Sequence, residues 1–161
     1  MGDLPGAVLW DMDGTLVDTE RYWIASERAL VSRFGGQWPD HHAHHLIGFD
    51  LLDAGAYLDG VTARVRDDIP WRPGARELLA ELVSLQVPCA LVTMSWRRVA
   101  SAVVEALPAG SFATVVCGDD VQQGKPHPEP YLVAAERLGV PPQRCVAIED
   151  SPTGARAAAA A

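Results

Sequence analysis

Short, continuous apolar runs alternate along the chain with longer segments in which apolar residues recur every three or four positions. A strand buried on both faces of a parallel sheet is apolar at nearly every position, whereas an amphipathic helix is apolar along one stripe. The alternation predicts an α/β fold, with a parallel sheet of at least four strands flanked by helices and joined by right-handed crossovers. The predicted strands cover residues 7–10, 88–93, 114–117 and 145–148.

The helical spacing predicts five helices around these strands. The first follows Thr19, a suitable N-cap, and ends at Gly35-Gly36, because serine, threonine and aspartate favour the start of a helix and glycine favours its end. A last helix begins at Ser151-Pro152 and runs into the terminal alanines. The others cover residues 75–86, 97–107 and 128–138.

Residues 37–69 contain no convincing strand and predict only helical pieces, around residues 46–58 and 61–66. This segment is inserted between the loop after the first strand and the next helix, so we expect it to form a small helical lobe over that loop. Trp71 to Gly74, with proline and glycine, resembles a hinge that returns the chain. The expected division is a core of residues 1–18 and 71–161 and a lobe of residues 19–70.

Charged residues stand where the predicted strands end. The first strand stops at Asp11 and Asp13, and the fourth stops at Glu149 and Asp150. In open α/β sheets, ligands bind beyond the carboxyl ends of the strands, so these four carboxylates should share one site. Carboxylates that converge in this way need a hard cation, and ligation by oxygen alone suits Mg²⁺.

The pair Asp11 and Asp13 suggests a nucleophile and a proton carrier. Aspartate can attack a phosphoryl group and form an aspartyl-phosphate, while a neighbouring acid moves protons. Thr93 ends the second strand, and Lys125 is fixed between Gly124 and a proline, so it could neutralise charge on phosphoryl oxygens. Taken singly, each motif has an ordinary structural explanation, such as an Asp/Gly turn or a surface lysine.

Four segments together identify a family. The residues DMDGTLVD resemble the first signature of the haloacid dehalogenase (HAD) superfamily, and three further signatures follow in the family's order: Thr93 in LVTMS, Lys125 in GKPHPEP, and Glu149-Asp150 in AIEDSPTGA. The chain is most similar to the branch of phosphoglycolate phosphatases and β-phosphoglucomutases, from Ala7 to Ala158. The resemblance implies a HAD-like, Rossmann-like core with a helical cap that closes over the substrate.

The resemblance also implies roles for the residues that match the signatures. Asp11 would be the nucleophile, Asp13 the general acid and base, and Thr93 and Lys125 the other catalytic residues. Mg²⁺ would bind to Asp11, to Asp150 and to the backbone carbonyl of Asp13, with Glu149 bound directly or through water. The phosphate-binding set would be Asp11, Met12, Asp13, Thr93, Met94 and Lys125. The substrate would be a small phosphorylated metabolite.

Three functions other than that of a phosphatase are possible for a chain with these motifs. Mutases of this branch carry a histidine at the position of Trp23, and a basic residue often stands where this chain has Phe49, so both differences favour a phosphatase. Dehalogenases of the superfamily lack the second aspartate, which is present here as Asp13. A non-catalytic binder of phosphorylated ligands is suggested by the short cap and by the family's additional C-terminal strand, but a binder of anions would gain from losing Asp11.

Composition narrows the choice of partners. The chain of 161 residues has 13 basic and 21 acidic side chains and a net charge of −8, so nucleic acid is an unlikely partner. No apolar run is long enough to span a bilayer. The spacing of the three cysteines, Cys89, Cys117 and Cys145, is not typical of metal ligands. We therefore expect them to be buried, reduced thiols of a cytoplasmic protein. We also expect the protein to be a monomer. The histidines at 41, 42, 44 and 45 are interpreted as part of a solvated helix or loop rather than a site.

Overall fold

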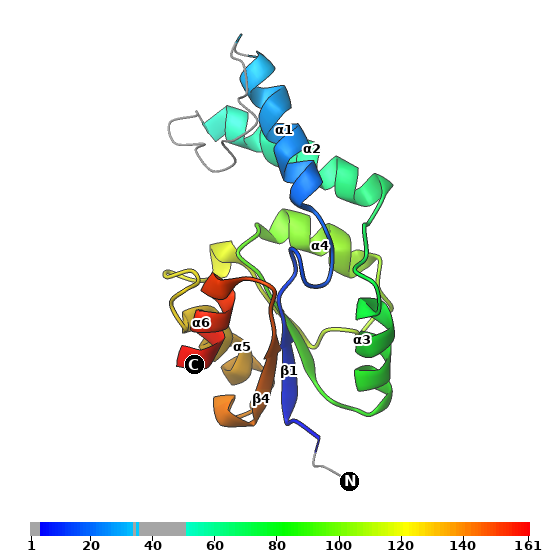
Figure 1. The fold of residues 1–161 in the computed structure, drawn as a ribbon, viewed down its shortest axis with the longest axis vertical. Helices are drawn as coiled ribbons and strands as arrows, with labels where there is room; N and C mark the ends of the chain where they lie inside the picture. The colour runs from blue at the N-terminus through cyan, green and yellow to red at the C-terminus, as the bar shows by residue number, and fades with distance from the viewer. Residues whose placement is uncertain (1–3, 34, 36–50) are drawn as a thin grey trace.

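The computed structural model describes residues 4–33, 35 and 51–161 of the chain, and its centre is a sheet of four parallel strands (Figure 1). The strands are β1 (Ala7–Trp10), β2 (Cys89–Val92), β3 (Thr114–Val116) and β4 (Cys145–Ile148), in the order β3-β2-β1-β4. The predicted parallel α/β sheet is therefore confirmed, with strand boundaries within a residue or two of those expected.

Helices cover both faces of this sheet. The α-helices are α1 (Glu20–Arg33), α2 (Leu51–Asp67), α3 (Ala75–Ser84), α4 (Arg97–Glu105), α5 (Glu129–Leu138) and α6 (Pro152–Ala160), and two 3₁₀ turns are η1 (Gly118–Asp120) and η2 (Pro142–Arg144). Side chains of β1 point alternately to the two faces: Val8 and Trp10 pack with α3 and α4, and Leu9 packs with α5 and α6. Because β1 is an inner strand that is covered on both faces, all four of its residues are buried.

The segment before α3 differs from the sequence expectation. Instead of separate helical pieces, residues 51–67 form one helix that runs through Gly60. A Cβ atom at Gly60 would lie 3.2 Å from the Arg64 guanidinium and 3.4 Å from the Ser26 hydroxyl, so glycine lets α2 approach α1 closely. Close helix packing thus outweighs the weak helix propensity of glycine. The expected helix over residues 46–50, Phe49 and the four histidines at 41–45 lie outside the described residues.

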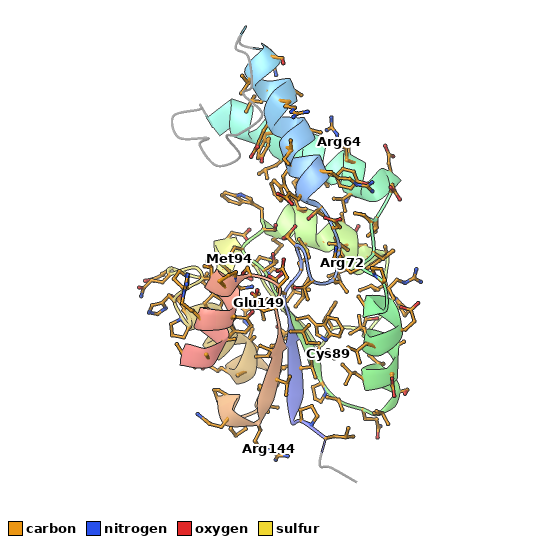
Figure 2. The ribbon with its side chains drawn as sticks, in the orientation of Figure 1. Arg64, Arg72, Cys89, Met94, Arg144 and Glu149 are labelled. Atoms are coloured by element: carbon orange, nitrogen blue, oxygen red, sulfur yellow. The ribbon has the colours of Figure 1, made fainter. Side chains whose placement is uncertain are left out.

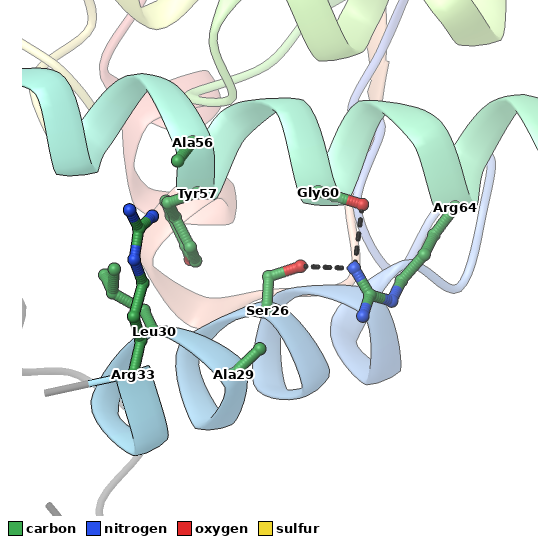
Figure 3. A pocket seen from close by; sticks show the side chains of 8 residues that line it. All are labelled: Ser26, Ala29, Leu30, Arg33, Ala56, Tyr57, Gly60 and Arg64. Carbon is green, nitrogen blue, oxygen red and sulfur yellow. Dashed lines mark hydrogen bonds between the residues drawn. The ribbon is translucent and has the colours of Figure 1, made fainter. Parts of the chain in front are cut away.

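The helices α1 and α2 lie against each other at one end of the molecule, beyond the carboxyl ends of the strands (Figure 1). Arg64 on α2 joins them, since its Nη1 donates to Ser26 Oγ at 3.2 Å and to the Gly60 carbonyl at 2.9 Å (Figure 3). Beside this contact lies a cavity of about 140 Å³. It is lined by Ser26, Ala29, Leu30, Arg33, Ala56, Tyr57, Gly60 and Arg64.

The pair α1–α2 is connected to the sheet by two chain segments that hydrogen-bond to each other. Asp18 N donates to the Pro70 carbonyl at 2.8 Å, and Arg72 N donates to the Leu16 carbonyl at 3.0 Å. Val61 and Val65 of α2 also belong to the same buried cluster as Val99 of α4. The division into a core and a lobe of residues 19–70 remains a prediction. None of the described helices is long and apolar enough to cross a membrane.

All three cysteines are free thiols in the structure. Cys89 and Cys117 are buried, as expected, and burial raises the pKa of Cys117 to about 11, so its thiolate is disfavoured. Cys145 is half-buried, so the expectation of burial was wrong for this residue. The reason is that β4 is an edge strand, with its side chains only partly covered.

Leu91, a fully buried residue of β2, provides a test of this core. Replacing it with alanine removes buried methyl groups and leaves a cavity, so the free energy of unfolding in urea should fall by about 2–5 kcal/mol. The matched control is Leu85→Ala. Because the Leu85 side chain is 48% exposed, this substitution should lower the free energy of unfolding by less than about 0.5 kcal/mol. Equal losses in both variants would contradict the described burial of β2.

Candidate active site

Asp11, Glu149 and Asp150 meet at one edge of the sheet because two neighbouring strands end there. Trp10 of β1 is in register with Ile148 of β4, and Asp11 N donates to the Ile148 carbonyl at 3.0 Å. One carboxylate oxygen from each of the three acids lies within 4.8 Å of the others. Glu149 lies at the edge of the sheet that faces α1 and α2 (Figure 2). The predicted convergence is confirmed for these three carboxylates, whereas the side chain of Asp13, the fourth acid expected there, is not part of the group.

Lys125 lies between two of these acids. Its Nζ is 2.6 Å from Asp11 Oδ1 and 2.5 Å from Glu149 Oε1, and it also donates to the Val92 carbonyl at 2.9 Å. Only 6% of its side chain is exposed. A buried ammonium offers three donors, and here three acceptors use them, so its burial is compensated. Lys125 therefore neutralises negative charge of the carboxylates at the strand ends. Its expected action on phosphoryl oxygens remains a prediction.

Glu149 is held from several directions. Its Oε1 accepts from the Tyr131 hydroxyl at 2.8 Å, and its Oε2 accepts from the Ser151 amide at 3.2 Å and the Ser151 hydroxyl at 3.0 Å. Burial by itself would raise the pKa of Glu149. The hydrogen bond and charge of Lys125, together with the hydrogen bonds from Tyr131 and Ser151, outweigh burial and lower that pKa. Gly154 leaves room for this carboxylate, because a Cβ there would lie 1.7 Å from Oε1.

Asp11 is in a different environment from Glu149, although both contact Lys125. Burial is the largest influence on Asp11 and exceeds the opposing effect of Lys125, so its pKa rises to about 6. Nearby Glu149 and Asp13 raise it further. Asp11 is ionised at neutral pH, but it takes up a proton in mild acid.

The Asp13 carboxylate receives four donors from two parts of the chain. Thr93 Oγ1 and Ser95 Oγ, at the end of β2, lie 3.1 Å and 2.7 Å from Oδ2. The Thr19 hydroxyl and the Trp23 indole Nε1, at the start of α1, donate to Oδ1, the indole at 3.3 Å. Asp13 thus connects the sheet edge to α1 through hydrogen bonds on both of its oxygens.

The acidic group fits a divalent cation. Asp11, Glu149 and Asp150 together offer only hard oxygen ligands, which is the donor set that Mg²⁺ and Ca²⁺ prefer. Asp150 is exposed and has one long contact, with Thr15 Oγ1 at 3.4 Å, whereas Glu149 is already engaged with Lys125. The Asp13 side chain is not in this group, and the expected use of its backbone carbonyl remains a prediction.

Gly14 brings Asp150 close to the chain segment that follows β1. Its φ of 95° lies in the left-handed region, and a Cβ atom there would lie 2.1 Å from Asp150 Oδ2. A residue with a side chain would be strained at this φ and would displace that carboxylate. Glycine at this position therefore allows the left-handed backbone conformation and leaves room for the Asp150 carboxylate.

Two adjoining cavities of about 630 Å³ and about 530 Å³ open above these residues. The first contains Asp11, Thr93 and Lys125 in its lining, together with Met94 and Trp96. The second extends towards α1 and is lined by Gly14, Asp18, Glu20, Ile24 and Glu27 among others. Both cavities share Asp13, Trp23, Tyr57, Asp150 and Ser151 in their linings.

Several contacts of the site were not predicted from the sequence. Tyr131, on α5, is the hydrogen-bond partner of Glu149 and lies with its ring centre 5.1 Å from Lys125 Nζ. Ser95 contacts Asp13, and its position two residues after Thr93 was the only available signal. The Met12 side chain is fully buried, so only its backbone could bind phosphate. Phosphate binding by Met12 and Met94 remains a prediction.

The raised pKa of Asp11 leads to a prediction about metal binding. A cation and a proton compete for this carboxylate, so Mg²⁺ affinity should fall about tenfold for each pH unit below the pKa of about 6. Isothermal titration calorimetry at about pH 5 and about pH 8, on either side of that value, measures the effect. Asp11→Asn should bind weakly at both pH values. Equal affinity of the unmodified chain at both would contradict the prediction.

Known proteins are similar to this chain in sequence and in fold. Hexitol phosphatase A of Escherichia coli is 36% identical over 91% of this chain and 74% of its own length. The phosphorylated carbohydrates phosphatase of Thermotoga maritima is 31% identical over 96% of this chain and 81% of its length. The crystal structure of CbbY from Rhodobacter sphaeroides in complex with phosphate superimposes with a TM-score of 0.83 at 26% identity, covering 97% of this chain and 82% of that one. Residues 5–161 match the haloacid dehalogenase-like hydrolases, and the chain belongs to this family.

Proposed function

We propose that this chain is a Mg²⁺-dependent phosphatase that hydrolyses a small phosphorylated metabolite through an aspartyl-phosphate. The observation that carries the proposal is Asp11, a buried carboxylate at the base of a cavity, with Lys125 on one side and Asp13 also lining the cavity. Two relatives named as phosphatases of carbohydrate phosphates support it. Residues 19–70 would act as the cap over this cavity.

In the first step, Asp11 attacks the phosphorus atom of the bound ester. Lys125 engages Oδ1, so we assign the attack to Oδ2. The new bond forms between Oδ2 and phosphorus, the bond from phosphorus to the alcohol oxygen breaks, and Asp13 gives its proton to that oxygen. The Lys125 ammonium offsets negative charge of the phosphoryl group and of Asp11.

In the second step, Asp13 has become a carboxylate and takes a proton from a water molecule. The water oxygen forms a bond to phosphorus while the bond from phosphorus to Asp11 breaks, which releases inorganic phosphate and regenerates both aspartates. Asp11, Asp150 and Glu149 would hold Mg²⁺, together with the backbone carbonyl of Asp13. When bound, Mg²⁺ neutralises charge on the phosphoryl oxygens.

Trp23 determines which oxygen of Asp13 can carry the proton. An indole N–H can only donate, so Asp13 Oδ1 must accept from it at all times. The hydroxyls of Thr93 and Ser95, which contact Oδ2, can either donate or accept. Protonated Asp13 would therefore carry its proton on Oδ2. Since an indole cannot take up and return protons, the contact also favours a phosphatase over a mutase.

Replacing the nucleophile tests the proposed chemistry. Asp11→Asn keeps the size of the side chain but removes its charge, so phosphate release from a panel of phosphorylated metabolites should fall about a thousandfold or more. Phosphate release by the unmodified chain should also stop with EDTA and return with Mg²⁺. The matched control is Asp67→Asn, an exposed residue of α2 outside the cavities, which should retain full activity.

The same panel separates the other functions. A mutase would convert hexose 1-phosphates into hexose 6-phosphates and release little phosphate. A non-catalytic binder would show ligand binding with no turnover. Either result from a folded, Mg²⁺-loaded protein would contradict the proposed phosphatase.

Trp23→Phe tests the hydrogen bond to Asp13. Phenylalanine retains an aromatic ring beside Tyr57, whose ring centre lies 5.8 Å from that of Trp23, but it has no N–H. Losing one hydrogen bond to a carboxylate that moves protons should lower kcat about tenfold, with a smaller change in KM. A normal kcat with a raised KM would show instead that the indole only contacts the substrate.

A further inference from the structure

The cavity that extends from Asp13 towards α1 is unusually acidic. Carboxylates line it from the loop after β1, from α1 and from the end of β4, and its described lining contains no lysine or arginine. The acids are Asp13, Asp18, Glu20, Glu27 and Asp150. If the chain is a phosphatase with Asp11 as nucleophile, as proposed above, this cavity lies beside the proton carrier Asp13 and would receive the leaving alcohol.

Glu27 has a weakly compensated carboxylate in this cavity. Its Oε1 accepts a long hydrogen bond of 3.4 Å from the Tyr57 hydroxyl, and its Oε2 is buried without a hydrogen-bond partner. A buried oxygen of this kind is rare, because it has lost water without gaining another donor. Because Glu27 also lines the cavity, its negative charge repels an anionic group that enters there.

Three arginines of α1 and α2 have partners outside this cavity. Arg21 pairs with Asp68 at 2.9 Å, Arg66 pairs with Glu105 at 3.5 Å, and Arg64 is engaged with Ser26. None of the three contributes to the lining of either cavity above the strand ends. Residues 36–50 add four histidines to the sequence but no lysine or arginine.

The hydrogen-bonding character of the cavity selects the leaving group. In the proposed mechanism Asp13 carries a proton and Asp150 holds Mg²⁺. The other three carboxylates of the cavity, when ionised, can only accept hydrogen bonds, so a group that lies beside them must donate. Hydroxyl and ammonium groups donate, whereas a second phosphate or a carboxylate offers mainly acceptors and adds repulsion. Aromatic rings of Trp23, Tyr57 and Trp96 line the neighbouring space and offer apolar surface to the carbon skeleton of such a group.

We propose that this cleft is specific for phosphate monoesters whose leaving group donates hydrogen bonds and carries no second anionic group, and that Glu27 excludes the anionic ones. The leaving group is a polyol or an amino alcohol, since both present donors to the same carboxylates. Esters with a second phosphate or a carboxylate on the leaving group are poor substrates, because that charge enters the acidic cavity.

Three esters of similar size test this specificity. Glycerol 3-phosphate and 3-phosphoglycerate differ mainly in a hydroxymethyl group against a carboxylate, and phosphoethanolamine carries an ammonium. We expect kcat/KM for glycerol 3-phosphate to exceed that for 3-phosphoglycerate at least about tenfold. The rate with phosphoethanolamine shows which of the two donors, hydroxyl or ammonium, the cavity prefers.

The variant Glu27→Gln identifies the source of the discrimination. Glutamine has nearly the same shape without the charge, so the ratio of kcat/KM for glycerol 3-phosphate over 3-phosphoglycerate should fall roughly fivefold, as expected when one unit charge is removed beside a partly hydrated cavity. Glu81→Gln, on the exposed side of α3 and away from both cavities, makes the same charge change and should leave the ratio unaltered.

The outcomes separate this inference from the proposed function. Comparable kcat/KM for glycerol 3-phosphate and 3-phosphoglycerate in the unmodified chain would overturn the inference and leave the phosphatase intact. A ratio that Glu27→Gln does not change would overturn the role of Glu27. No turnover of any of the three esters, or of a generic aryl phosphate, would instead contradict the proposed function itself.

Discussion

The contact on which the site depends is the ion triad of Lys125 with Asp11 and Glu149. Two carboxylates at the ends of neighbouring strands repel each other at the sheet edge, and the buried ammonium between them offsets that repulsion. Buried ion groups are costly unless every donor and acceptor is used, and here the third proton of Lys125 goes to the Val92 carbonyl. The triad thereby fixes the ends of β1, β2 and β4 relative to one another.

The four carboxylates of the site differ because each has different neighbours. Glu149 is bound by Lys125, Tyr131 and Ser151, which suits a residue that positions the lysine. Burial dominates at Asp11 and raises its pKa, while Asp150 remains exposed and nearly free of partners. Asp13 takes its donors from outside the triad. The same functional group, a carboxylate, thus acquires different properties through differences in burial and hydrogen bonding.

The hydrogen bonds of Asp13 connect the sheet edge to the helices above it. Thr93 and Ser95 hold this carboxylate from β2, and Thr19 and Trp23 hold it from α1. Movement of α1 relative to the sheet would change these contacts directly. The same helix carries Glu27. If Asp13 is the proton carrier and Glu27 repels anionic leaving groups, as proposed, this helix takes part in both proton transfer and substrate selection.

The sequence by itself determined the sheet, most helix positions and the residues at the strand ends. Short apolar runs have few alternatives to buried parallel strands, and side chains that follow such strands must meet at one edge, so Asp11, Glu149 and Asp150 could be placed together. The sequence predicted separate helical pieces in place of the continuous helix α2, because a glycine such as Gly60 favours a break in a helix. In three dimensions the same glycine allows close packing against α1.

Only the tertiary structure determined how the acidic residues differ in burial and which side chains contact them. Tyr131 reaches Glu149 from a helix on one face of the sheet, and Tyr57 reaches Glu27 across the pair α1–α2. Contacts of this kind join residues with no fixed spacing in the sequence, so hydrophobic periodicity and short motifs carry no signal for them. Burial and hydrogen-bond partners set the charge of each carboxylate, and both arise only when distant segments pack together.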